Sequence, residues 1–169
     1  MKCVFFMIPF VLVANLAWTK GKDFREVVFE YEKGHKLTLQ STEFVAAEHK
    51  LKRCGKESIC LIDGKPFFGS DGDVPRRELV SMKVEIQDKP IELDVTGMFN
   101  PWNVYKNEDY VSKDQYRIEH IWENTWVLRG SFSDGAGYYS AEWMISEGGS
   151  IRTILKSLEG LSHSCDAMD

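Results

Sequence analysis

Four carboxylic acids in the second half of the sequence are the side chains best suited to catalysis. Two carboxylates about 5 to 9 Å apart can cleave a glycosidic bond, and neighbouring strands can bring two side chains that close together. The four candidates are Glu119, Glu123, Asp134 and Glu142. Their spacing selects no pair among them, so we assign no catalytic residue and keep a hydrolase as the third functional hypothesis.

Two glycine-rich segments offer weaker candidates. Residues 130–135 read Gly-Ser-Phe-Ser-Asp-Gly, which misses the G-x-S-x-G order of a catalytic serine turn and is typical of a strand that runs into a turn. Residues 69–73 read Gly-Ser-Asp-Gly-Asp. That composition could surround Ca²⁺, but it lacks oxygen ligands at alternate positions and a closing Glu. We predict an acidic turn there and leave Ca²⁺ binding open.

The histidines do not predict a metal site. The four of them, at positions 35, 49, 120 and 163, lie far apart, and the cysteines do not form two pairs. Metal sites in sequences are marked by closely spaced histidine and cysteine ligands. We therefore predict no metal and no cofactor.

The N-terminus has the composition of a secretory signal peptide. Lys2 is followed by an uninterrupted apolar run, residues 3–14, which is too short to span a membrane. We predict a signal peptide over residues 1–19, cleaved between Ala17 and about Thr19; the alternative is a buried strand or helix. Cys3 precedes the apolar run, so no lipid anchor and no stable membrane anchor is predicted. The expected location is secreted or periplasmic.

Removal of the predicted signal peptide would remove Cys3. Three cysteines, an odd number, would then remain in an oxidising compartment. The three are Cys54, Cys60 and Cys165. Cys54 and Cys60 flank a short polar loop between two segments that look extended, so we predict a disulfide between them. Cys165 lies in a small polar tail; its pairing with either of the others is the alternative.

The net charge of the chain limits the kinds of partner that it can bind. The chain of 169 residues has a net charge of -5. A general nucleic-acid binder needs a basic surface to neutralise phosphates, so we predict no nucleic-acid partner. An acidic exported protein is instead suited to a basic protein partner, because complementary charge steers association.

The rest of the chain has the pattern of a sheet protein. Short runs rich in Val, Ile, Phe, Tyr, Thr and Trp alternate with turn residues, which predicts one all-β domain over residues 20–160, mainly antiparallel, as a β-sandwich or small β-barrel. Residues 161–169 are expected to form a flexible tail. Hairpins are predicted at Lys33-Gly34 and Asp63-Gly64, the latter joining strands 60–62 and 65–68.

Two further regions carry specific strand predictions. Alternation in residues 91–95 predicts a strand with one buried face, and residues 116–155 predict a four-strand antiparallel meander. Residues 43–52 fit a strand or a helix equally well.

Aromatic residues are concentrated in the loop from Phe99 to Asp114. Pro101 prevents helix there, so the side chains around it are hard to bury. We predict a partner-binding surface, because exposed aromatic side chains dominate protein interfaces; the alternative is a hydrophobic plug over the open end of the sandwich. The predicted contact residues are Trp102, Tyr105, Glu108, Asp109 and Tyr110.

These observations favour a protein that acts by binding. The first hypothesis is an exported, non-enzymatic inhibitor or immunity-type protein that occludes a partner protein, such as a basic exported enzyme. The alternative is a β-barrel carrier whose aromatic side chains line a cavity for a small ligand or glycan.

Overall fold

The computed structural model describes residues 23–54, 58–105 and 108–157. These residues form twelve strands and four short 3-10 turns. All strand pairs within the sheets are antiparallel, which confirms the predicted all-β class. The predicted signal peptide, the C-terminal tail and Cys165 lie outside the described residues.

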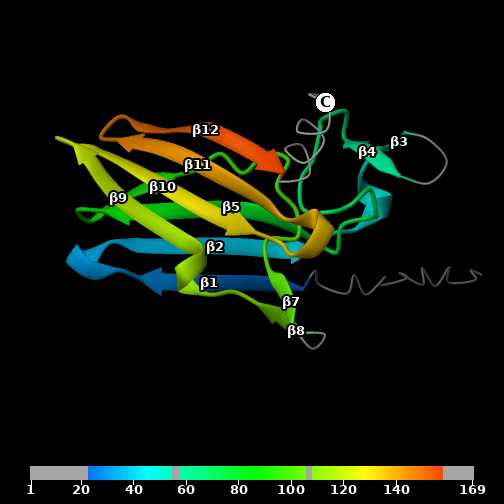
Figure 1. Ribbon diagram of the computed structural model, residues 1–169, viewed down its shortest axis with the longest axis horizontal. Helices are drawn as coiled ribbons and strands as arrows, with labels where there is room; N and C mark the ends of the chain where they lie inside the picture. Colours follow the sequence, from blue (N-terminus) through cyan, green and yellow to red (C-terminus); the bar gives the residue numbers. More distant parts are fainter. Residues whose placement is uncertain (1–22, 55–57, 106–107, 158–169) are drawn as a thin grey trace, which may run out of the picture.

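Two four-stranded sheets form the body of the molecule (Figure 1). The first sheet, in the order β1-β2-β5-β6, consists of β1 (Phe24–Glu30), β2 (Lys36–Glu43), β5 (Arg77–Ile86) and β6 (Lys89–Glu92). The second, in the order β12-β11-β10-β9, consists of β9 (Tyr116–Trp122), β10 (Thr125–Phe132), β11 (Tyr139–Ser146) and β12 (Gly149–Ser157). The second sheet is the predicted four-strand meander.

Smaller elements connect or extend these sheets. Two hairpins are β3 (Leu51–Arg53) with β4 (Ile59–Ile62) and β7 (Asn103–Tyr105) with β8 (Glu108–Tyr110). The 3-10 turns are η1 (Glu32–Gly34), η2 (Ala46–Glu48), η3 (Lys113–Gln115) and η4 (Gly135–Gly137). Residues 43–52, predicted as strand or helix, instead end β2, form η2 and begin β3.

The apolar sides of the two sheets face each other and form the main core. Side chains on alternate positions of β10 and β11 point inward, as the period of a strand requires. The largest fully buried side chains of the second sheet are Phe132, Tyr139 and Trp143. They pack in one cluster with Leu37, Leu39, Met82 and Val84 of the first sheet. Burial of apolar surface is the main source of stability for such an arrangement.

The two sheets are joined along the β6–β12 edge by side chains. The buried Trp143 donates its indole N–H to the carbonyl oxygen of Asp94 at 2.9 Å. Arg152 pairs with the Asp94 carboxylate at 3.1 Å and donates to the Thr96 carbonyl at 2.8 Å. Because the sheets are two separate ladders, we describe the fold as a sandwich.

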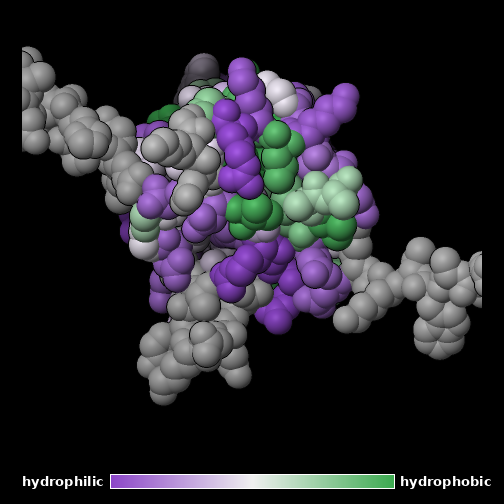
Figure 2. All heavy atoms as spheres, turned by 90° about the vertical axis from the view of Figure 1, so that its right-hand side faces the viewer, coloured by the Kyte–Doolittle hydropathy of each residue, from purple (hydrophilic) through white to green (hydrophobic). Residues whose placement is uncertain are grey.

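A small lobe covers one end of the sandwich, which we call the lobe end. It consists of β3, β4 and a second cluster of buried side chains: Phe44, Ile59, Ile62 and Phe99. Cys54 and Cys60 are joined by a disulfide, as predicted. Figure 2 looks at this end and shows hydrophobic residues gathered near its centre and hydrophilic residues around them.

The predicted hairpin at Asp63-Gly64 is wrong in its second strand. Residues 65–68 form only isolated bridges, Ile62 to Lys65 and Phe68 to Met98, and β4 pairs with β3 instead. The turn itself forms, with positive φ at both Asp63 and Gly64. Turn chemistry is local, whereas the choice of partner strand depends on the lobe.

The loop formed by residues 96–102 packs against the lobe end of the sandwich. Asn100 adopts a positive φ of 43°, and its side-chain oxygen accepts hydrogen bonds from the backbone N–H groups of Arg76 and Arg77 at 2.8 and 3.0 Å. Its side-chain nitrogen donates to the Gly69 carbonyl at 2.7 Å. A Cβ at Gly69, where φ is 104°, would lie 1.9 Å from the Phe99 carbonyl oxygen, so this close approach requires glycine.

The loop therefore buries Trp102, which is 3% exposed and belongs to the main core. The prediction of an exposed contact residue is wrong for this side chain, because Asn100 anchors the loop over the sandwich. Its side chain contributes to the main core and not to an exposed contact surface.

We expect Trp102→Ala to lower the free energy of unfolding by about 3 to 5 kcal/mol, because it removes a large buried aromatic side chain. Equilibrium unfolding in urea measures this change. Tyr110→Ala, at a side chain that is 54% exposed, is the control and should stay within about 0.5 kcal/mol of wild type. A loss below about 1 kcal/mol for Trp102→Ala would mean that the loop is not part of the core.

Candidate functional site

The sequence-predicted partner-binding residues do not form one described surface. Trp102 is buried, and Tyr110 is 54% exposed on β8. The side chains of the other three, Tyr105, Glu108 and Asp109, lie outside the described part of the structure. The structure therefore leaves Tyr110 as the one exposed aromatic contact among the described members of this set.

The four candidate carboxylates are also separated by the fold. Glu119 and Glu142 are both paired with Arg129, at 2.5 and 2.7 Å, on the outer face of the second sheet. Asp134 precedes η4. Glu123 lies in the turn after β9, at the opposite end of the sandwich from the lobe. The Arg129 guanidinium holds both of its carboxylate partners in ion pairs, which does not resemble an acid and base pair ready for hydrolysis.

The β1–β2, β5–β6, β9–β10 and β11–β12 turns gather at the end of the sandwich opposite the lobe (Figure 1). A cavity lined by residues of both sheets lies at this end. We call it the mouth cavity. Its volume is about 630 Å³, within the range of small-molecule sites. Its lining residues are Tyr31, Glu32, Lys33, His35, Gln87, Lys113, Ile118, His120, Glu123 and Trp126.

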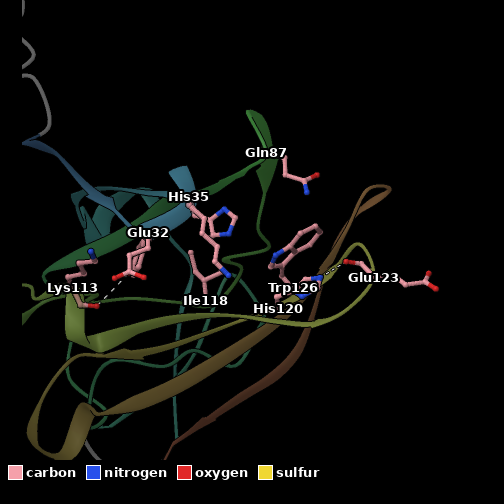
Figure 3. A pocket seen from close by; sticks show the side chains of 10 residues that line it. Glu32, His35, Gln87, Lys113, Ile118, His120, Glu123 and Trp126 are labelled. Atoms are coloured by element: carbon pink, nitrogen blue, oxygen red, sulfur yellow. Dashed lines mark hydrogen bonds between the residues drawn. The ribbon is translucent and has the colours of Figure 1, made fainter.

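Both sheets contribute to the mouth cavity (Figure 3). The η1 turn supplies Glu32 and Lys33, and His35 lies between this turn and β2; the turn forms with a φ of 62° at Lys33 and of 75° at Gly34. Strand alternation puts Ile118 and His120 of β9 on the inner face of the second sheet.

Trp126 and His120 form one wall of the cavity. They are paired across β9 and β10, and their ring centroids are 5.2 Å apart. The Nε2 atom of His120 is hydrogen-bonded to the carbonyl oxygen of Glu123. A carbonyl only accepts, so Nε2 carries the proton, and in the neutral ring Nδ1 of His120 is an acceptor.

The η3 turn holds the two sheets together beside the cavity. The Lys113 ammonium donates to the Glu30 carbonyl at 2.5 Å and lies 4.5 Å from the centroid of the Tyr31 ring. The Tyr31 hydroxyl donates to the Tyr116 carbonyl at 3.4 Å. Burial first, and then the charge of Asp114, raises the pKa of Tyr31 to about 12. The Lys113 ammonium therefore makes its contacts at the edge of the cavity.

His35 is the least satisfied polar side chain of the mouth cavity. Its Nδ1 atom is buried and has no hydrogen-bond partner among the described residues. Desolvation, followed by the nearby charges of Lys33 and His120, lowers the pKa of His35 below its ordinary value of 6.5. The ring is therefore neutral near pH 7. Its Nδ1 atom, like Nε1 of the core residue Trp102, is enclosed by protein atoms and does not face the cavity.

The mouth cavity combines apolar and polar walls. Ile118 and Trp126 supply apolar surface, while charged and polar side chains surround it, as in small-molecule sites. Within the described ranges, no three His, Cys, Asp or Glu side chains are arranged to hold a metal ion. Sequence reasoning missed this site because it considered the histidines only as metal ligands, and only folding brings His35 and His120 together.

Comparisons with known proteins identify no relative of this chain. No protein-family model, no curated protein and no solved structure matches the chain.

We expect the imidazole of His35 to titrate with a midpoint below 6.5, followed by NMR of its ring protons. Lys33→Gln should raise this midpoint, because it removes a nearby positive charge. Lys36→Gln, one residue beyond His35 on β2, is the matched control and should have a smaller effect. A midpoint at or above 6.5 in wild type would contradict the burial of the ring.

Proposed function

We propose that the protein is an exported, non-enzymatic binding protein that holds a small organic ligand in the mouth cavity. One observation carries this proposal: a cavity of about 630 Å³ to which both sheets contribute, with Ile118 and Trp126 beside the polar side chains of Glu32, Lys33 and His120. Such a combination of apolar surface and a few convergent polar groups is typical of ligand sites.

The proposed extracytoplasmic location is supported by the disulfide and by the N-terminal sequence. The disulfide between Cys54 and Cys60 is suited to an oxidising compartment. In the part of the chain that the structure describes, no helix is long and apolar enough to cross a membrane. The apolar run after Lys2 supports a cleaved signal peptide, and thus a secreted or periplasmic protein without a stable membrane anchor. The negative net charge argues against a nucleic-acid partner.

We expect the neutral apolar dye N-phenyl-1-naphthylamine to bind with a stoichiometry of one per folded chain. Ile118→Trp fills the cavity from the inner face of β9 and should weaken this binding at least about tenfold, which a fluorescence titration measures. Ile154→Trp is the matched control: Ile154 lies on β12 and is 38% exposed. Equal loss in both variants, or loss in neither, would place the dye elsewhere and contradict the proposal.

A second candidate function, a protein that occludes a partner protein, has its own supporting observation. On the outer face of the second sheet the exposed Met144 and Ile151 are opposite each other, and Met144 is also opposite Val127, which is 4% exposed. Met144 and Ile151 are 43% and 64% exposed, and Ile121 on β9 is 50% exposed. Exposed apolar surface next to ion pairs resembles the core and rim of an interface. The partner would be an exported protein with an apolar contact surface, and the acidic net charge favours a basic enzyme.

The Met144→Lys/Ile151→Lys double variant tests this second function. It should fold as wild type does, because both side chains are exposed, and should weaken a partner recovered from the exported fraction by about tenfold or more. Thr38→Lys, on the outer face of the first sheet, is the control. A partner that binds the double variant and wild type equally would exclude this face.

A further inference from the structure

We propose that the outer face of the second sheet packs against the same face of a second copy of the chain, which makes a symmetric dimer. The twofold axis runs parallel to the strands, between β10 and β11. This inference goes beyond the ligand proposed for the mouth cavity and does not depend on it. It names a different occupant for the face that a foreign partner protein would use.

Strand alternation and register define the outer face. In β10 the even-numbered side chains belong to the core, so the odd-numbered ones point outward. The register of the four strands then arranges the outward side chains in rows across the sheet. The first row consists of Glu119, Val127, Met144 and Ile151. The second row consists of Arg117, Arg129, Glu142 and Ile154.

Three apolar side chains of these rows are open to solvent. Met144, Ile151 and Ile154 are 43%, 64% and 38% exposed. They lie close together on β11 and β12, because Met144 is opposite Ile151 and the adjacent Glu142 is opposite Ile154. A contiguous apolar patch on the surface of a protein marks an interaction surface.

The charges of this face balance, although the chain as a whole has a net charge of -5. The charged side chains are Arg117, Arg129 and Lys156 against Asp114, Glu119 and Glu142. Two acidic copies repel each other, so they approach best where the local charges cancel. A strongly basic partner finds no excess of negative charge on this face.

A rotation of 180° about an axis along the strands makes the face complementary to itself. The rotation reverses the order of the strands and keeps each row at its height, so β10 lies over β11 of the second copy. Since Arg129 and Glu142 are opposite each other in one chain, Arg129 of each copy faces Glu142 of the other. In the same way Val127 faces Met144. This is the aligned packing that two twisted sheets favour.

The Arg129 guanidinium can serve both chains. Within its own chain it donates through Nε to Glu142 at 2.7 Å and through Nη1 to Glu119 at 2.5 Å. A guanidinium has five N–H donors, so others remain for the carboxylate of the second copy. Its side chain is 50% exposed, which leaves that side of the group open to a partner.

The next row adds a second complementary pair. It contains Ser131 and Ser140, with Lys156 opposite Ser140 on the edge strand β12. Asp114 lies at the other edge, two residues before β9. Lys156 and Asp114 border one shallow depression of about 370 Å³ that the two serines also line. The reversed order of the strands brings Lys156 near Asp114 of the second copy.

The size of the face sets the expected strength of the dimer. Four strands of 7 to 9 residues cover about 20 by 25 Å, at roughly 4.8 Å between strands and 3.3 Å per residue. Such a face is at the small end of specific interfaces. We therefore expect a dissociation constant in the micromolar range.

Sedimentation equilibrium of the purified mature protein tests the dimer. Wild type should show a concentration-dependent equilibrium between monomer and dimer. Arg129→Glu sets carboxylates against each other across the axis, and Glu142→Arg does the same with guanidinium groups. Each variant alone should therefore raise the dissociation constant at least about tenfold.

An equal mixture of the Arg129→Glu and Glu142→Arg chains is the decisive sample. Within each chain the ion pair between β10 and β11 stays broken, whereas across the axis each acidic side chain meets a basic one. Dimers should reappear, and native mass spectrometry should identify them by mass as heterodimers. If the two residues acted only within their own chain, mixing would restore nothing.

Two further sets of variants complete the test. Lys83→Glu is the matched control, because it breaks an exposed ion pair with Glu92 on the first sheet and should leave the dissociation constant unchanged. Asp114→Lys mixed with Lys156→Glu repeats the experiment at the second complementary pair. This mixture decides the question if circular dichroism shows that either variant of the first pair does not fold.

The inference would be overturned by a wild type that stays monomeric up to roughly 0.2 mM, by single variants that dimerise as wild type does, or by mixtures that give no heterodimer. A monomeric wild type whose foreign partner is lost from the Met144→Lys/Ile151→Lys variant would assign the face to the second candidate function. None of these outcomes affects the ligand proposed for the mouth cavity, which the dye titration tests separately.

Discussion

The hydrogen bonds of the Asn100 side chain are the constraint on which the shape of the molecule depends. One amide bonds three backbone groups in two segments, the carbonyl of Gly69 and the N–H groups of Arg76 and Arg77. In doing so it holds the loop 96–102 over the lobe end and places Trp102 in the core. A half-buried amide that satisfies three backbone groups is costly to replace, because each group would otherwise lose this partner. The lobe end is thereby filled, and the mouth cavity lies at the other end.

Both ends also depend on contacts between the sheets. Trp143 and Arg152 fix one edge through Asp94, and Lys113 fixes the other edge next to Tyr31. Between these two edges the turns at the mouth diverge enough to leave a cavity lined by both sheets. The site is therefore a consequence of packing, and its polar groups come from segments that share no local pattern.

Local sequence patterns predicted the parts of the fold that depend on neighbours in the chain. The meander of β9 to β12 follows from alternation and turn residues, and the disulfide follows from two cysteines around a short loop. The environment of Trp102 could not be predicted in this way, because the partners of Asn100 lie 23 to 31 positions away. The same holds for the mouth cavity: neither His35 nor His120 has a distinctive local sequence, and their relation appears only when the sheets pack.

The most direct test of the account is native mass spectrometry of the protein purified without denaturation from the exported fraction of the cells that make it. A small organic ligand in the mouth cavity predicts a stoichiometric low-mass adduct on wild type and on Ile154→Trp that is lost from Ile118→Trp. A stoichiometric protein partner, with no low-mass adduct and with equal recovery on Ile118→Trp, would contradict the account and favour the outer face of the second sheet instead.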